Sequence, residues 1–122
     1  MKYLCIAYEE EQKLNDLSEA EWQALRQETL DYVGRLRSRG RLIVTHALQS
    51  ATTASMVRVR NGEPLVTDGP FTETKEQIGG FFLIEAADAA EALDIAANWP
   101  SARIGSIEVR PIAEELPMDR RY

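Results

Sequence analysis

The sequence predicts an α+β domain of the ferredoxin-like kind, with an antiparallel sheet and helices on one of its faces. The chain has 122 residues, so we expect one domain over residues 1–122 with one core. Hydrophobic residues make up 44% and charged residues 28%, which is typical of globular proteins. The hydrophobic pattern predicts, in order, strand, helix, strand, hairpin, strand, helix and strand, and this order contains two βαβ-like halves.

The first two predicted elements are a strand and a long helix. Residues 2–8 are rich in strand-forming side chains and precede an acidic run, so we expect a strand buried on both faces. Ser18 and Glu21 have capping-box spacing, and Gly40 suits the left-handed conformation that ends helices, which predicts a helix over 19–39. Its apolar stripe consists of Trp22, Leu25, Thr29, Tyr32, Val33 and Leu36.

A second strand and a β-hairpin are predicted next. The second strand is expected at 41–49. Residues 54–60 and 63–67 have the composition of two further strands, and Asn61 and Gly62 between them form the dipeptide preferred in two-residue type I′ turns. This spacing predicts a tight antiparallel hairpin.

The last part of the chain supplies another strand, a helix and a strand. Residues 80–86 form the first of these. Asp88 is placed to cap a second helix, and Pro100 prevents its continuation because proline lacks the backbone donor. Residues 104–112 are the last predicted strand.

Helices on one side of an antiparallel sheet leave its other face uncovered. If two copies stack these faces, a homodimer with a barrel-like interior results, and Arg58, Glu108 and Arg110 lie beside Phe81 and Leu83. The alternative is a solvated sheet face with cross-strand ion pairs. Alternation alone leaves both open.

The charge of the chain argues against nucleic-acid and membrane partners. Fourteen Lys and Arg against twenty Asp and Glu give a formal net charge of -6, which repels phosphates and anionic lipids. The arginines at 35–41 fall at the predicted helix end, where cations favour the helix dipole, so we interpret them as structural. The apolar segment 1–7 is too short for a signal sequence, and no segment reaches membrane-spanning length, so we expect a cytoplasmic protein.

Cys5 and His46 are the only cysteine and histidine. Cys5 lies in an apolar strand and is expected to be buried as a small hydrophobe. Alternation puts His46 on one strand face with Leu42, Val44 and Leu48, where it either titrates beside a carboxylate or is a satisfied core or edge histidine. Because no His/Cys cluster exists, we expect no metal site and no cofactor.

The segment 67–80 constrains the backbone most strongly and carries several polar groups. Pro70 fixes its own φ and restricts Gly69, so the loop is expected to be stiff. Asp68 precedes this turn and could either cap backbone amides as an Asx-turn or project into a cleft as a general acid or base. Phe71 offers a hydrophobic anchor against the sheet.

The second half of this segment adds two charged candidates. Glu73 and Lys75 are two apart and would not face each other on a helix, so each could reach a different partner or the pocket. Thr74 and Gln77 have capping-box spacing, which predicts a short helical turn. The glycine pair at 79–80 suits a bulge or the close approach of another backbone or a ligand.

Together these residues resemble the signature of the DGPF-type branch of the YCII-related (YciI-like) family. The resemblance covers nearly the whole chain. It rests on Lys2-Tyr3-Leu4-Cys5, on Val57-Arg58-Val59-Arg60, on Asp68-Gly69-Pro70-Phe71-Thr72-Glu73-Thr74-Lys75-Glu76-Gln77, on Gly79-Gly80-Phe81-Phe82 and on Ile107-Glu108-Val109-Arg110-Pro111.

The resemblance implies a ferredoxin-like, dimeric α+β barrel. The wider superfamily is suspected of enzymatic activity because a histidine and an aspartate share a cleft in its members. The resemblance implies that Asp68 matches this aspartate. That histidine lies in the first helix of the relatives, whereas the predicted helix 19–39 has none. DGPF-type members are often encoded beside extracytoplasmic-function sigma factors, which implies a regulatory alternative.

Two functions are therefore open. In the first, a pocket at the DGPF loop binds a small polar molecule, and Asp68 performs acid–base chemistry on it. The candidate ligand-binding residues are Phe71, Glu73, Lys75, Arg58 and His46. In the second, the chain is a non-enzymatic accessory protein whose acidic surface, at 9–11 and 114–115, meets a basic partner such as a sigma factor.

Overall fold

Strands and helices alternate along residues 1–113, which are the residues that this computed structural model describes. The strands are β1 (Lys2–Glu10), β2 (Leu42–Ala47), β3 (Ser55–Arg60), β4 (Glu63–Asp68), β5 (Glu76–Glu85) and β6 (Ser106–Pro111). The helices are α1 (Glu11–Asn15), α2 (Glu19–Ser38) and α3 (Ala89–Ala97), and two short 3-10 turns are η1 (Ala51–Thr53) and η2 (Pro100–Arg103). The α+β class predicted from the sequence is confirmed.

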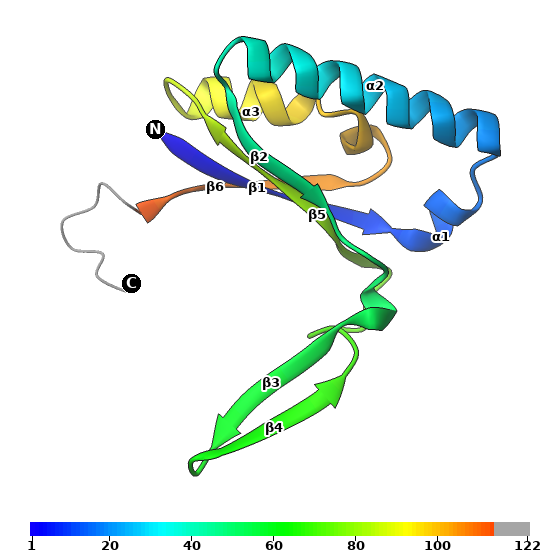
Figure 1. Ribbon diagram of the computed structural model, residues 1–122, viewed down its shortest axis with the longest axis vertical. Helices are drawn as coiled ribbons and strands as arrows, with labels where there is room; N and C mark the ends of the chain where they lie inside the picture. The colour runs from blue at the N-terminus through cyan, green and yellow to red at the C-terminus, as the bar shows by residue number, and fades with distance from the viewer. Residues whose placement is uncertain (114–122) are drawn as a thin grey trace.

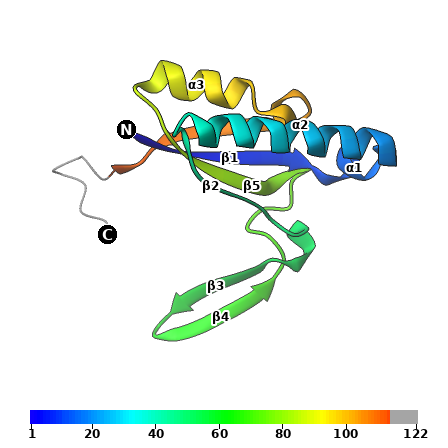
Figure 2. The same cartoon turned by 45° about the horizontal axis from the view of Figure 1, so that its top comes forward.

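The main sheet has four antiparallel strands in the order β2-β5-β1-β6. In its centre Cys5 on β1 lies opposite Phe82 on β5 and Val109 on β6. Helices α2 and α3 lie over one face of this sheet (Figures 1 and 2). This arrangement is compatible with a ferredoxin-like fold.

The core lies between these helices and the sheet. Leu36 of α2 and Ile84 of β5 are both fully buried there. Trp99 stacks on Phe82, with ring centroids 3.8 Å apart and an interplanar angle of 6°. The Tyr32 hydroxyl donates to the carbonyl oxygen of Ile95 at 2.8 Å, which joins the two helices. Buried apolar area of this kind is the main source of the stability of a small domain.

The local signals for α2 and α3 are confirmed. The Ser18 hydroxyl accepts from the Glu21 amide at 3.1 Å, and the Glu21 carboxylate accepts from the Ser18 amide at 3.0 Å. After α2, Gly40 has a φ of 68°, a conformation that glycine adopts at little cost. The Asp88 carboxylate caps α3 through the Glu91 amide at 2.9 Å.

The two faces of β1 differ in burial. Tyr3, Cys5 and Ala7 face the helices and are buried, whereas Leu4 and Ile6 on the other face are half-buried. The prediction of a strand buried on both faces is therefore wrong for residues 1–113 of the single chain, because no helix in this range covers the second face.

His46 lies on this uncovered face rather than with Leu42. An irregularity between Leu42 and Val44 shifts the register, so Leu42 lies opposite the buried Ile84 while His46 lies opposite Phe81. The expectation that His46 and Leu42 share a face is wrong for this reason. Alternation holds only where a strand has no bulge.

Strands β3 and β4 form a separate two-stranded hairpin that projects on the side away from the helices (Figures 1 and 2). Asn61 and Gly62 have φ values of 52° and 78°, which confirms the predicted type I′ turn. Every residue of β4 is exposed. Arg58 therefore does not lie beside Phe81 and Leu83 within one chain, because its strand is not part of the main sheet.

The structure also changes the predicted path into β5. Strand geometry begins at Glu76, and the Gln77 side chain donates to the carbonyl oxygens of Thr72 and Thr74 at 2.6 and 3.0 Å. The predicted helical turn at Thr74–Gln77 is wrong, because these side-chain bonds close an extended loop. The predicted bulge is confirmed, since the β1–β5 register shifts at Gly79.

Candidate functional site

Asp68, the predicted acid or base, lies at the end of β4 opposite Ser55. Its side chain is exposed. Within residues 1–113 the carboxylate makes no hydrogen bond to the loop amides, so it does not form the predicted Asx-turn. The backbone closes the loop instead, because the Gly69 amide donates to the carbonyl oxygen of Ala54 at 2.7 Å.

Two of the predicted ligand-binding residues are in contact. The Arg58 guanidinium lies 5.8 Å from the ring centroid of Phe71, whose side chain is 72% exposed. Arg58 faces Leu65 across the hairpin, whereas Asp68 pairs with Ser55 three positions away, so the aspartate and the arginine lie on opposite hairpin faces.

The other predicted residues lie apart from this contact. Glu73 and Lys75 are exposed, and neither forms an ion pair with any residue from 1 to 113. The His46 ring lies 5.9 Å from the ring of Phe81 on the main sheet. In the single chain, the DGPF loop and the hairpin thus present an exposed surface.

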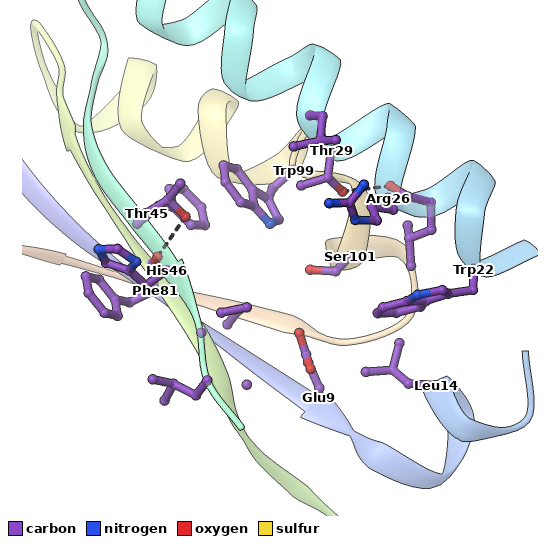
Figure 3. Close-up of a pocket in the computed structure, with 18 of the residues that line it drawn as sticks. Glu9, Leu14, Trp22, Arg26, Thr29, Thr45, His46, Phe81, Trp99 and Ser101 are labelled. Atoms are coloured by element: carbon purple, nitrogen blue, oxygen red, sulfur yellow. Dashed lines mark hydrogen bonds between the residues drawn. The ribbon is translucent and has the colours of Figure 1, made fainter. Parts of the chain in front are cut away.

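A cleft with a volume of about 1060 Å³ lies elsewhere, between the N-terminal half of α2 and the end of the main sheet (Figure 3). We call it the α2 cleft, and define it by Glu9, Leu14, Trp22, Arg26, Thr29 and Trp99. Of the six residues predicted from the sequence, only His46 is among its lining residues, and the His46 ring itself lies on the uncovered face beside Phe81 (Figure 3).

The α2 cleft exists because only the second half of α2 packs on the sheet. Tyr32, Val33 and Leu36 are buried, whereas Trp22, in the same apolar stripe, is 45% exposed. The Trp22 ring therefore forms a wall of the cleft (Figure 3). Trp99, stacked on Phe82, lines the end nearest the core.

Glu9 is the half-buried carboxylate of the α2 cleft. It continues the helix-facing series of β1 after Ala7, and its carboxylate points into the cleft in Figure 3. Burial, and to a lesser degree the charge of Glu11, raises the pKa of Glu9. Within residues 1–113 this carboxylate has no hydrogen-bond or ion-pair partner.

Gly79 makes room for Glu9 at the β-bulge. A Cβ atom at Gly79 would collide with the Glu9 carboxylate. The bulge and the absent side chain thus leave room for the half-buried carboxylate against the sheet.

The other glutamates of the acidic run have partners within the chain. Glu10 forms an ion pair with Lys13 at 3.5 Å. The Glu11 carboxylate accepts from the Ala51 amide at 2.7 Å and from the Ser50 hydroxyl at 2.9 Å, and these bonds lower its pKa. Two of the three carboxylates at 9–11 are therefore engaged within the chain, so the expected acidic surface is not continuous there. Residues 114–115 lie outside the described part. An interaction with a sigma factor stays a prediction.

Arg26 is one of two cations that line the α2 cleft from the helix; the other is Arg37. The Arg26 guanidinium extends from α2 toward the space above Glu9 (Figure 3), and among residues 1–113 it has no ion-pair partner. The nearby Glu28 is engaged by Arg103, whose two nitrogen atoms lie 2.6 and 2.7 Å from its two oxygens. The Thr29 hydroxyl donates to the carbonyl oxygen of Leu25 at 2.8 Å.

Residues 1–113 give no support to a reactive thiol, a metal site or a membrane-spanning helix. Cys5 is fully buried, and this burial raises the pKa of its thiol to about 12, which confirms that it packs as a hydrophobe. Residues 1–113 contain no group of three or more His, Cys, Asp and Glu that could hold a metal ion. In the same range, no helix has the length and apolar character needed to cross a membrane.

Comparison with known proteins identifies the family. The model of the YCII-related domain matches residues 1–116. The chain belongs to the YCII-related family. An uncharacterized protein from Rhizobium meliloti (strain 1021) is 36% identical over 119 residues, which cover 96% of each chain. The YCII-related resemblance predicted from the sequence is confirmed, and the match spans both the α2 cleft and the hairpin.

Sequence reasoning missed the α2 cleft because its residues carry weak signals. Trp22 and Thr29 belong to a stripe that predicts core packing along the whole helix. Glu9 was the first residue of an acidic run and marked the end of a strand. The available signal was Gly79, since a predicted bulge turns or repositions a neighbouring side chain.

Proposed function

We propose that this YCII-related chain binds a small molecule in the α2 cleft and exchanges a proton with it through Glu9. The observation that carries the proposal is a half-buried carboxylate, without a partner in residues 1–113, that faces a cleft of about 1060 Å³. A buried polar group without a hydrogen bond costs free energy, and a bound donor would recover it.

The raised pKa of Glu9 suits acid–base chemistry. A general acid or base works best when its pKa lies near the working pH, and burial moves Glu9 in that direction. The ionised form accepts a proton from the ligand, and the neutral form returns it. Asp68 is exposed at the hairpin base, so the environment favours Glu9 for this role.

The test is a screen of a metabolite library by thermal shift on the wild type, Glu9→Gln and Asp68→Asn. We expect a hit that stabilises the wild type and Asp68→Asn but not Glu9→Gln, each measured against its own ligand-free melting temperature. Loss of the hit in Asp68→Asn, with Glu9→Gln unaffected, would place the acid–base group in the DGPF loop and refute the role of Glu9.

We also propose that the chain works as a homodimer, in which a second copy covers the hairpin and the uncovered sheet face. Val57, Val59 and Val66 share one hairpin face and are 61%, 59% and 65% exposed. A lone two-stranded hairpin is marginally stable in water, and contiguous exposed apolar side chains mark interaction surfaces. Leu4 and Ile6 on the uncovered sheet face add further apolar area.

A further inference from the structure

The charged groups of the α2 cleft define a class of ligand. Glu9 lies on the sheet side and Arg26 on the helix side. Their charged atoms do not form an ion pair with each other, since within residues 1–113 neither has a partner at 4.0 Å or less. The cleft therefore presents an unpaired anionic group on the sheet side and an unpaired cationic group on the helix side, and Glu19 and Arg37 of α2 also line it.

Neighbouring charges do not neutralise this pair. Glu11 is occupied by the Ser50 hydroxyl and the Ala51 amide, and both oxygens of Glu28 are held by Arg103. These contacts join α1 to η1 and α2 to η2.

Aromatic side chains and the Ser101 hydroxyl line the surface between the two charges. The Trp22 ring lies between the level of Arg26 and that of Glu9 and Leu14 in Figure 3. Trp99 lines the inner end. Aromatic walls of this kind bind flat or apolar bodies, while a few placed polar groups fix their orientation.

We infer, on the basis of the proposed function, that the α2 cleft takes a zwitterionic small molecule with an apolar body, in the manner of an amino acid with a ring side chain. Its ammonium group donates to Glu9, and its carboxylate accepts from Arg26. The apolar body lies against Trp22. A ligand with only an anionic group leaves Glu9 unpaired, which is costly because Glu9 is half-buried. A ligand with only a cationic group forgoes the charge-assisted hydrogen bonds that the exposed Arg26 offers.

The experiment compares matched probes by isothermal titration calorimetry. Tryptophan carries both charges, tryptamine only the cation and indole-3-propionate only the anion, and phenylalanine, phenethylamine and 3-phenylpropionate form a second series. We expect the zwitterion of at least one series to bind about tenfold or more tightly than both partners, because charge-assisted hydrogen bonds discriminate strongly.

Single-residue variants then assign each end of the ligand. Glu9→Gln should abolish the preference over the anion-only probe, and Arg26→Gln should abolish the preference over the cation-only probe. Glu63→Gln and Arg60→Gln, both exposed in the hairpin, are matched controls that should leave both preferences unchanged.

The outcomes separate this inference from the proposed function. Equal binding within each series, no binding in either series, or unchanged preferences in Glu9→Gln and Arg26→Gln overturns the inference. If another ligand from the metabolite screen still requires Glu9, the proposed function stands without it. If no ligand of any class requires Glu9, both fail.

Discussion

Gly79 offers the sharpest test of the α2 cleft, because one added methyl group should displace Glu9 without unfolding the chain. In Gly79→Ala the new Cβ would occupy the position of the Glu9 carboxylate, which is the far end of a flexible side chain. The backbone at Gly79 does not have a positive φ, so alanine fits the main chain. We expect Glu9 to rotate toward solvent.

The expected change in the free energy of unfolding in Gly79→Ala follows from two opposing terms. Forcing a side chain from its preferred rotamer costs about 0.5–1.5 kcal/mol. Replacing glycine by alanine in a strand gains about 0.5–1 kcal/mol. The free energy of unfolding should therefore change by less than about 1 kcal/mol.

Gly80→Ala is the matched control. Its Cβ would lie 2.9 Å from the carbonyl oxygen of His46 and 3.3 Å from the Cα of Ala47, and both atoms belong to the backbone of β2. Because a strand must move to relieve this contact, we expect a loss of about 1–3 kcal/mol.

Urea denaturation measures both free energies, and NMR titration of the Glu9 carboxyl group gives its pKa without any ligand. In Gly79→Ala the pKa of Glu9 should fall toward that of an ordinary glutamate, because burial is the largest cause of its rise. A loss of more than about 2 kcal/mol in Gly79→Ala, or an unchanged Glu9 pKa, would refute the reasoning.

Three further predictions concern stability and assembly. Because burial raises the folded-state pKa of Glu9, its contribution to stability is complete below the unfolded-state pKa of about 4.3 and is lost as the pH rises through the folded-state value. The unfolding free energies of the wild type and Glu9→Gln should thus converge near pH 4, and the variant should become the more stable as the pH rises, as urea titrations at several pH values would show; parallel curves would contradict this. Val66→Glu should dissociate the proposed homodimer in sedimentation velocity, whereas Leu93→Glu, at an apolar position of α3 that is 58% exposed, should not; equal behaviour of the two would remove the hairpin from the interface. Ser18→Ala should lower the melting temperature by removing the α2 cap, which contributes about 1 kcal/mol, and calorimetry that found no change would show that the capping box is dispensable.

The elements that could be predicted are those whose signals are local. The capping box at Ser18 and Glu21 and the turn at Asn61 and Gly62 involve atoms only a few residues apart, so composition and spacing suffice to find them. Asp88 is a third case of this kind. The formation of these caps and of this turn does not depend on how the rest of the chain packs.

The elements that could not be predicted depend on distant parts of the chain. The same apolar stripe runs along α2, yet only its second half packs, because Trp99 and the sheet reach Leu36 but leave Trp22 half-exposed. Glu9 enters the cleft because β1 pairs with β5, and the bulge at Gly79 comes from that pairing. No window of sequence around Glu9 contains this information.

The separate hairpin has a consequence for the modular construction of this chain. β2 and β5 are neighbours in the main sheet, and the Leu48 amide donates to the carbonyl oxygen of Gly79 at 2.8 Å, so the chain leaves and re-enters the sheet at one place. The excursion over 49–75 is thus an insertion in topological terms, and a short loop could close the same four-stranded sheet. Five of the six functional residues predicted from the sequence thus lie in a segment that adds no strand to the main sheet.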